Sequence, residues 1–292
     1  MLHNIEIAAQ LLESIFIPLI LIELWVLRRQ RRLGWPRLKE MLANGTTYLI
    51  YAAAGVVGVL VWTQVFDAVE GAVPFSIPTT WWSIPLAIVV ADLIYWWQHK
   101  LAHERRVLWD LYHSVHHSSE RFDQSTSLRL GVFDALLTIV FTLPMVVVGF
   151  SSGLTLASTA VVLGYQTWIH TEVIQKMPRW FEAIFNTPSH HRAHHGAEHP
   201  YLDVNYGGIL IIWDRLFGTF QREINTPIYG LTEQIDSSNP IDIQFAELRR
   251  LIRDLRADTD WSTRWARLWN PPGWQLPEGI EEAPITERRR FP

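Results

Sequence analysis

Five long apolar runs restrict what this chain can fold into. They cover Leu12–Leu27, Thr47–Phe66, Trp81–Gln98, Val132–Phe150 and Leu154–His170. A helix that crosses the hydrocarbon core of a bilayer needs about 20 mostly apolar residues, and most of these runs reach or approach that length. The composition agrees, since 49% of the 292 residues are hydrophobic and 15 are tryptophan. The pattern predicts an all-α fold, an integral membrane helical bundle with about four to five spans.

The first apolar run is the one whose crossing stays open. Glu13 and Glu23 lie in or beside it, and carboxylates inside a membrane usually face the bundle interior or the interface. The run has no basic flank before it and no small-residue cleavage signal, so we expect a retained anchor. Cysteine is absent, which excludes disulfides, thiolate metal sites and a cysteine nucleophile. A net charge of only −4 gives no indication of a nucleic-acid partner.

The basic residues are segregated along the chain. No lysine or arginine occurs between Lys39 and Lys100, or between Arg129 and Lys176. By the positive-inside rule, the segments 28–46 and 100–129 and everything after His170 lie in the cytoplasm. If the first run lies in the interface, the N-terminus changes side and these segments do not. We therefore expect a protein of a bacterial inner membrane with its C-terminus facing the cytoplasm.

Histidines form the strongest chemical signal. Eleven of the twelve lie between His99 and His199, mostly in three clusters. The clusters are His99-Lys-Leu-Ala-His103, His113-Ser-Val-His116-His117 and His190-His191-Arg-Ala-His194-His195. Neutral imidazole is the commonest metal ligand, and residues spaced i and i+4 share a helix face. A structural zinc ion takes only four ligands, so this many histidines indicate either two ions or many histidines that surround the ligands without binding metal. Because all three clusters fall on the cytoplasmic side, we expect a cytoplasmic helical cap that holds a histidine-rich di-metal site.

The residues around the clusters predict their setting. The second and third clusters should each place three imidazoles on one helical stripe. For the third, Asn186 or Thr187 can cap the helix, Pro188 fits its first turn, and Gly196 can end it. Packing or surface roles for the histidines remain the alternative.

Three further residues near the first cluster are candidates for catalytic roles. Asp92 and Tyr95 precede His99 by seven and four residues on roughly the same face, where they could orient metal-bound histidines. Glu104 follows His103 directly and could bind a metal, orient an imidazole or move protons.

The chain divides into three expected segments. Residues 1–80 form N-terminal spans and loops, 81–235 a histidine-box catalytic domain, and 236–292 a cytoplasmic C-terminal helix and tail. Within the last segment, Pro240–Ala257 predicts a helix capped by Asn239. Its apolar stripe favours packing on the core over a membrane-surface or partner role. We expect the tail Trp261–Pro292 to lie over the domain.

An H-x3-H, H-x2-HH, H-x2-HH set after membrane spans resembles the fatty acid hydroxylase/sterol desaturase superfamily. The resemblance extends over roughly residues 88–235 and includes Trp168-Ile-His170-Thr-Glu172, Asn205-Tyr206-Gly207-Gly208 and Trp213-Asp214-Arg215. It implies that Glu104 is the catalytic glutamate and that His190 and His199 are not ligands. The implied metal ligands are His99, His103, His113, His116, His117, His170, His191, His194 and His195.

The resemblance implies a membrane-bound, non-haem di-iron monooxygenase. It would hydroxylate a C–H bond of an ether lipid, sterol or fatty acyl chain with O2 and external electrons. The two iron ions could be replaced by zinc on expression, and the electron donor could be a reduced pterin or a redox protein. No residue set by itself predicts pterin binding. Lipid desaturation by the same site and zinc-dependent hydrolysis with Glu104 as base remain alternatives. A metal transporter is disfavoured, because its ligands would lie near the midplane of the bilayer.

Overall fold

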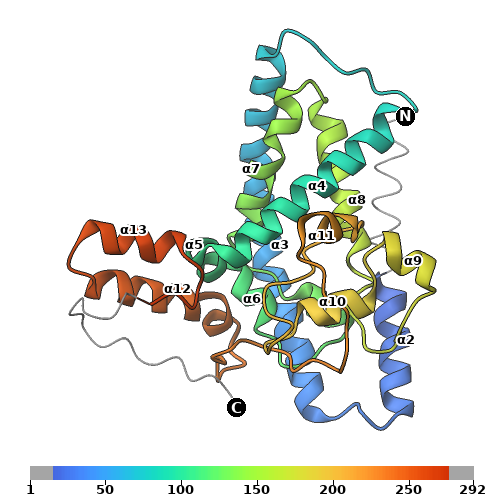
Figure 1. Cartoon of the computed structure of the whole chain (residues 1–292), viewed down its shortest axis with the longest axis vertical. Helices are drawn as coiled ribbons and strands as arrows, with labels where there is room; N and C mark the ends of the chain where they lie inside the picture. The colour runs from blue at the N-terminus through green and yellow to red at the C-terminus, as the bar shows by residue number, and fades with distance from the viewer. Residues whose placement is uncertain (1–15, 276–292) are drawn as a thin grey trace.

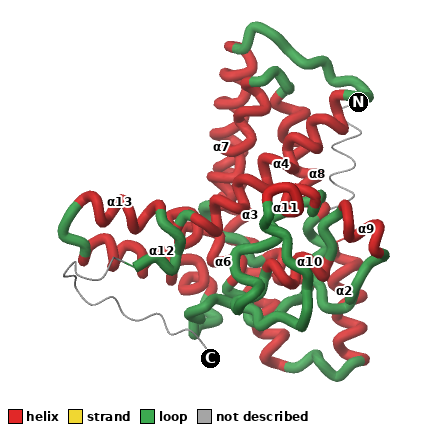
Figure 2. The backbone as a smooth tube through the Cα atoms, viewed as in Figure 1, coloured by secondary structure: helices red, strands yellow, loops and turns green. Residues whose placement is uncertain are grey.

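The computed structural model describes residues 16–275, and within them every regular element is helical (Figures 1 and 2). This confirms the all-α class. The long helices are α2 (Phe16–Arg29), α3 (Trp35–Ala72), α4 (Ser83–Glu104), α7 (Asp134–Val147), α8 (Ser152–Tyr165) and α12 (Pro240–Ala257). The shorter ones are α5 (Arg106–Leu108), η1 (Trp109–His113), α6 (Ser114–His117), η2 (Gln124–Leu128), α9 (Arg179–Ile184), α10 (Pro188–His194), α11 (Ile212–Phe217) and α13 (Trp261–Trp269).

Among the described residues, α3 is the one helix that is long and apolar enough to cross a membrane by length and composition. It contains the whole predicted run Thr47–Phe66, and it exposes side chains such as Val56, Val57 and Leu60. Exposed aliphatic side chains on such a helix suit contact with lipid. Residues 1–15 lie outside the described part, so the first part of the predicted run Leu12–Leu27 is not described.

Helices α7 and α8 are shorter than the predicted spans at Val132–Phe150 and Leu154–His170. Each has 14 residues, or about 21 Å at 1.5 Å per residue, less than the roughly 30 Å of a hydrocarbon core. Local features set these ends: Gly149 takes a left-handed φ of 98° after α7, and the Ser151 side chain caps α8 by accepting from Leu154 N at 3.2 Å. Beyond Tyr165 the chain turns, so His170 lies outside the helix that was predicted to carry it. The number of spans stays a prediction.

The helices α3, α4, α7 and α8 pack as a bundle (Figure 1). Their core is built largely from small and medium side chains, including Ala87, Ala91, Leu154 and Val162. At the end of the bundle away from the histidines, Ile77 N donates to Gly149 O at 2.7 Å. This bond joins the α3–α4 loop to the α7–α8 turn, and neither segment contains a lysine or an arginine.

Helix α12 confirms the sequence prediction at both ends. It runs over Pro240–Ala257, and Asn239 caps it by accepting from Ile241 N at 2.9 Å. Its Ile243 packs against Ala43 of α3 and Val115 of α6, as expected for a helix that covers the core.

The described part of the tail is helical. Residues Trp261–Trp269 form helix α13, which follows α12 and extends sideways from the bundle (Figure 1), and Arg105, directly after α4, donates to Trp269 O at 3.0 Å. That the tail lies over the domain stays a prediction. Residues 276–292 lie outside the described part.

Candidate metal centre

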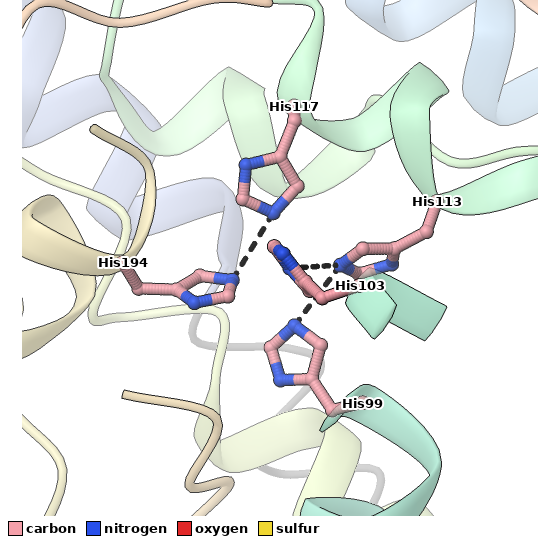
Figure 3. Close-up of side chains that lie close together, drawn as sticks. All are labelled: His99, His103, His113, His117 and His194. Atoms are coloured by element: carbon pink, nitrogen blue, oxygen red, sulfur yellow. Dashed lines mark hydrogen bonds between the residues drawn. The ribbon is translucent and has the colours of Figure 1, made fainter. Parts of the chain in front are cut away.

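Nine buried histidines form two groups, each of which could hold a metal ion. Within each group the ligand nitrogens all lie within 4.8 Å of one another. The first group is His99, His103, His113, His117 and His194 (Figure 3). The second group is His116, His170, His191 and His195. These are the nine histidines that the sequence predicts as ligands, and His190 and His199 belong to neither group.

In both groups the imidazoles face one another through their Nε2 atoms. In the first, His99 Nε2 and His103 Nε2 lie 3.0 and 3.1 Å from His113 Nε2, and His117 Nε2 lies 3.1 Å from His194 Nε2 (Figure 3). In the second, the Nε2–Nε2 distances run from 2.9 to 3.2 Å. Nitrogen lone pairs this close repel unless a proton or a cation lies between them, so the arrangement suits a bound cation.

Hydrogen bonds to the Nδ1 atoms explain why the Nε2 lone pairs are available to a metal ion. Four Nδ1 atoms lie 2.8–3.2 Å from backbone carbonyl oxygens. The pairs are His99 with Tyr206, His116 with Arg129, His170 with Gln166, and His194 with Val204. A carbonyl can only accept, so each Nδ1 carries the proton and each Nε2 lone pair is left for a metal. A fifth ring, His103, has its Nδ1 at 3.2 Å from the Asp203 carboxylate.

The membership of the groups corrects one prediction from the sequence. The three imidazoles predicted on one stripe in each of the second and third clusters divide between the groups, because His116 joins His191 and His195, and His194 joins His113 and His117. At about 100° per residue, side chains at i and i+4 differ by about 40°, whereas direct neighbours differ by about 100°. The i, i+4 pairs His113/His117 and His191/His195 therefore stay together. The remaining residues, His116 and His194, each point to the other group. The π-helical turn η1 before α6 is not the cause, since the same division occurs on α10.

Burial keeps these imidazoles neutral. Desolvation, with smaller contributions from neighbouring histidines, holds the pKa values of His113, His117 and His194 well below their ordinary value. Burial also lowers the pKa of His116 to about 4, although its bond to the Arg129 carbonyl opposes the shift. Neutral imidazole is the form that binds metal, so at neutral pH few protons need to leave before an ion binds.

Glu104 does not belong to either histidine group. Its carboxylate contacts Lys100 Nζ one helical turn earlier, and its side chain is one-third exposed. Its position beside the centre, next in sequence to His103, is as predicted, but the described contacts do not direct it at the ligands. A role for Glu104 in catalysis stays a prediction.

Asp92 and Tyr95 differ in their relation to His99. Tyr95 packs on the His99 ring with the ring centroids 5.2 Å apart. The expectation that Asp92 orients a histidine does not match its described hydrogen bonds. The Asp92 carboxylate accepts from Ile209 N at 2.6 Å, Leu210 N at 3.0 Å and Trp213 Nε1 at 2.8 Å. Asp92 thus anchors the segment 209–213 to α4, and its predicted catalytic role is untested.

Asp214 is a positioning residue that the sequence argument did not single out. Its buried carboxylate accepts from Tyr206 N and Gly207 N, both at 2.8 Å, and also from Trp96 Nε1 and Thr219 Oγ1. The Tyr206 carbonyl in turn accepts from His99. Asp214 lies within the stretch that carries the family resemblance. Its place among the mostly apolar residues Ile211–Phe217 could have indicated from the sequence that it is a buried acid.

Glu23 holds the segment next to His170. Its carboxylate, 3% exposed, accepts from Thr171 Oγ1 and Gln124 N, both at 2.5 Å. The acid that made the first apolar run uncertain therefore points into the protein and not to water.

The donor set fits two transition-metal ions. It consists of nine imidazole nitrogens without sulfur, and imidazole suits zinc, iron, copper and nickel. A tetrahedral zinc site takes four ligands, whereas the first group offers five.

Comparison with known proteins agrees with this chemistry. Residues 84–219 match the fatty acid hydroxylase family, and this segment contains all nine histidines of the two groups. This segment, a little under half of the chain, is therefore similar to the fatty acid hydroxylase family, which agrees with the resemblance seen in the sequence.

Three of the relatives have names that describe lipid-modifying enzymes. The chain is 38% identical to human alkylglycerol monooxygenase over 201 residues, which cover 69% of this chain and 44% of the human protein. It is 32% identical to an ornithine lipid hydroxylase of Rhizobium tropici, covering 54% of this chain and 49% of that protein. It is 24% identical to a delta(7)-sterol 5(6)-desaturase of Aspergillus fumigatus, covering 68% and 56%. The chain thus spans about half the length of the curated relatives it matches. No solved structure matches it significantly.

Proposed function

We propose that this chain is a membrane-bound oxygenase that uses O2 and external electrons to hydroxylate a C–H bond of a lipid. The observation that carries the proposal is the convergence of nine buried histidines in two adjacent groups, inside a segment that matches the fatty acid hydroxylase family. Two iron ions are the proposed cofactors, one in each group. When bound, they would supply the activation of O2.

The chain's own residues have three tasks in this proposal. The histidines hold the ions, and the backbone carbonyls of residues such as Tyr206 and Val204 fix the orientation of the rings. Burial keeps the imidazoles neutral and keeps bulk water away from the centre. Asp214 and Asp92 hold the loops that lie against α4, so that the ligands stay in position without the ions.

The substrate is proposed to be a lipid taken from the inner leaflet. His99 and His103 lie in the last two turns of α4, at the cytoplasmic end of the predicted span. Trp97 of α4 and Leu216 and Phe217 of α11 are exposed apolar side chains, and Phe217 packs on Trp96 of α4 with the ring centroids 4.6 Å apart. A lipid whose head group lies at the cytoplasmic surface could bring its apolar chain along this side. The bacterial inner membrane and the cytoplasmic orientation are parts of the same proposal.

Desaturation is the second candidate, because one relative is named a sterol desaturase. It would use the same histidine groups and the same removal of hydrogen from carbon. The two outcomes differ in their product, since hydroxylation adds one oxygen atom and desaturation removes two hydrogen atoms.

Turnover in labelled oxygen would test the proposal. The iron-loaded protein in lipid nanodiscs is supplied with alkylglycerols, sterols or ornithine lipids, a reduced pterin or a redox protein, and 18O2. Mass spectrometry should find a lipid that has gained one labelled oxygen atom, and the doubly substituted His117→Ala/His194→Ala variant should not form it. A product that has lost two hydrogens would favour the desaturase. Product formed without O2 would overturn both and favour the zinc hydrolase.

A further inference from the structure

Helix α13 carries a tryptophan face that nothing in the described protein covers. Trp261, Trp265 and Trp269 follow one another at every fourth position, and their side chains are 81%, 63% and 43% exposed. Thr263 and Arg267, on the opposite side of the helix, are buried. The apolar face therefore points away from the rest of the protein, although three tryptophans offer a large apolar area.

The orientation of this face is fixed by a buried ion pair. Arg267 donates from Nε and Nη2 to the two carboxylate oxygens of Asp258 at 2.7 and 2.6 Å, and both side chains are at most 2% exposed. A bidentate pair of this kind fixes geometry as well as attraction. The Asp260 side chain caps the helix by accepting from Thr263 N at 2.9 Å. The N-terminal cap and the buried ion pair therefore hold the helix with its tryptophans facing outward.

Two attachments set the height of α13 relative to the bundle. Arg105, the residue directly after α4, donates to Trp269 O at 3.0 Å, and Arg106 N donates to Asn270 O at 3.0 Å. Its partner α12 packs on Ala43 of α3, four residues before the apolar run that begins at Thr47. The tryptophan helix is therefore attached where α4 and the apolar part of α3 both end. Figure 1 shows α13 extending sideways from this level, across the direction of α3 and α7.

The composition of α13 suits one partner, a phospholipid surface. Tryptophan is enriched at membrane–water interfaces, and an amphipathic helix with an aromatic face lies in the plane of the interface. Helix α13 has no acidic residue. Its Arg267 is buried against Asp258, so Arg264, whose guanidinium lies 5.2 Å from the Trp261 ring, is the arginine of this helix that could meet lipid head groups. Contact with a second copy of the protein would not require α13 to lie at the level where α4 and the apolar part of α3 end, whereas contact with a membrane surface does.

We propose that α13 lies in the inner membrane–water interface, with Trp261, Trp265 and Trp269 inserted at the boundary between lipid head groups and acyl chains. This surface is separate from the histidine groups, and it shares with the proposed function only the membrane location. It would fix the depth and tilt of the bundle, and with them the height of the metal centre relative to the lipid.

Depth-dependent quenching can test the insertion, because the chain has no cysteine and single-cysteine variants of the full-length protein carry one label each. A fluorophore is attached to Trp265→Cys, to Arg253→Cys as an exposed control on α12, and to Val57→Cys as a control in the apolar part of α3. The proteins are placed in vesicles of phosphatidylethanolamine and phosphatidylglycerol that contain nitroxide lipids. Trp261→Cys serves as a second test position if Trp265→Cys does not fold.

We expect the label at position 265 to be quenched by lipids with a nitroxide near the head group. Aqueous iodide should quench it severalfold less than the label at position 253. Equal access of iodide to both labels would overturn the proposal. Protection from iodide without quenching by nitroxide lipids would also overturn it, since a protein would then cover the face.

The label at position 57 separates this proposal from the proposed function. If that label escapes quenching by deep nitroxide lipids, the membrane location fails, and the label at position 265 still decides whether α13 binds the lipid surface. None of these measurements depends on metal or turnover.

Discussion

Replacing Asp214 by asparagine would test whether one buried carboxylate keeps the metal centre in position. Asp214 is 0% exposed and accepts four hydrogen bonds. Two come from the backbone of Tyr206 and Gly207, the loop whose carbonyl at Tyr206 accepts from His99. Asparagine has nearly the same shape, but one of its two terminal atoms is a donor.

The size of the effect follows from the contacts of the two oxygens. If the amide oxygen takes the place of Oδ1, it keeps the bonds from Trp96, Tyr206 N and Thr219, while the amide nitrogen faces Gly207 N where the distance is now 2.8 Å. The lost charge-assisted bond is worth about 1.5–3 kcal/mol, and the unsatisfied N–H costs about 1–3 kcal/mol. Burial already raises the pKa of Asp214, so the neutral amide recovers part of this cost. We expect a net loss of about 2–4 kcal/mol in the free energy of unfolding.

The assay compares unfolding by denaturant with metal affinity measured against a chelator. Because Tyr206 would be displaced from His99, metal affinity should fall by about 10- to 100-fold. The matched control is Thr219→Val, which removes one of the four donors and should cost only about 0.5–1.5 kcal/mol. If Asp214→Asn unfolds at the same denaturant concentration as the unaltered protein and binds metal equally well, the positioning role of Asp214 is refuted.

Three other predictions concern the candidate metal centre and its neighbour Glu104. Replacing His117 and His194 by alanine removes two ligands from one group, so mass spectrometry should find the metal content reduced from about two ions to about one; replacing His116 and His117 instead should weaken both ions, and equal loss in the two variants would contradict the grouping. The metal-free protein should lose stability as the pH falls from about 6.5 to about 4, because His116 takes up a proton near its ordinary pKa in the unfolded chain, whereas its pKa in the folded protein is about 4. The free energy of unfolding should fall by about 1.4 kcal/mol for each pH unit in this range. Unfolding curves that do not change with pH would contradict this. Glu104→Gln should retain metal, because the carboxylate contacts Lys100, and should lose turnover if the resemblance applies to it; loss of metal would show that the carboxylate reaches the ions.

The parts of the fold that could be predicted are those set by local signals. Helix α12 begins at Pro240 because Asn239 caps it, and α10 begins at Pro188 after Thr187, as the sequence indicates. The lengths of α7 and α8 could not be predicted in the same way. Hydropathy reports how apolar a segment is, but a left-handed Gly149 and the residues after Tyr165 decide where the helices end.

The candidate ligand histidines could be predicted, but not what holds them. Eight of them follow from residue type and spacing in the three clusters, whereas His170 was implied by the family resemblance alone. Their Nδ1 partners are mostly backbone carbonyls, which any residue can supply, and Tyr206 is 107 positions from His99. Asp214 acts from 118 positions away from Trp96. Contacts at such separations depend on how the loops pack on α4, and a single sequence has no pattern that records them.

Helical phase explains why an isolated histidine belongs to the centre. The H-x3-H pair gives both of its imidazoles to the first group, and each H-x2-HH cluster divides between the groups, because neighbouring side chains differ by about 100°. The clusters alone would therefore supply five histidines to the first group and only three to the second. His170, which lies in no cluster, is the fourth histidine of the second group. The Gln166 carbonyl holds it there through its own Nδ1, and Glu23 does so through the neighbouring Thr171. The turn after α8 that shortens the predicted span is thus what brings His170 to the metal centre.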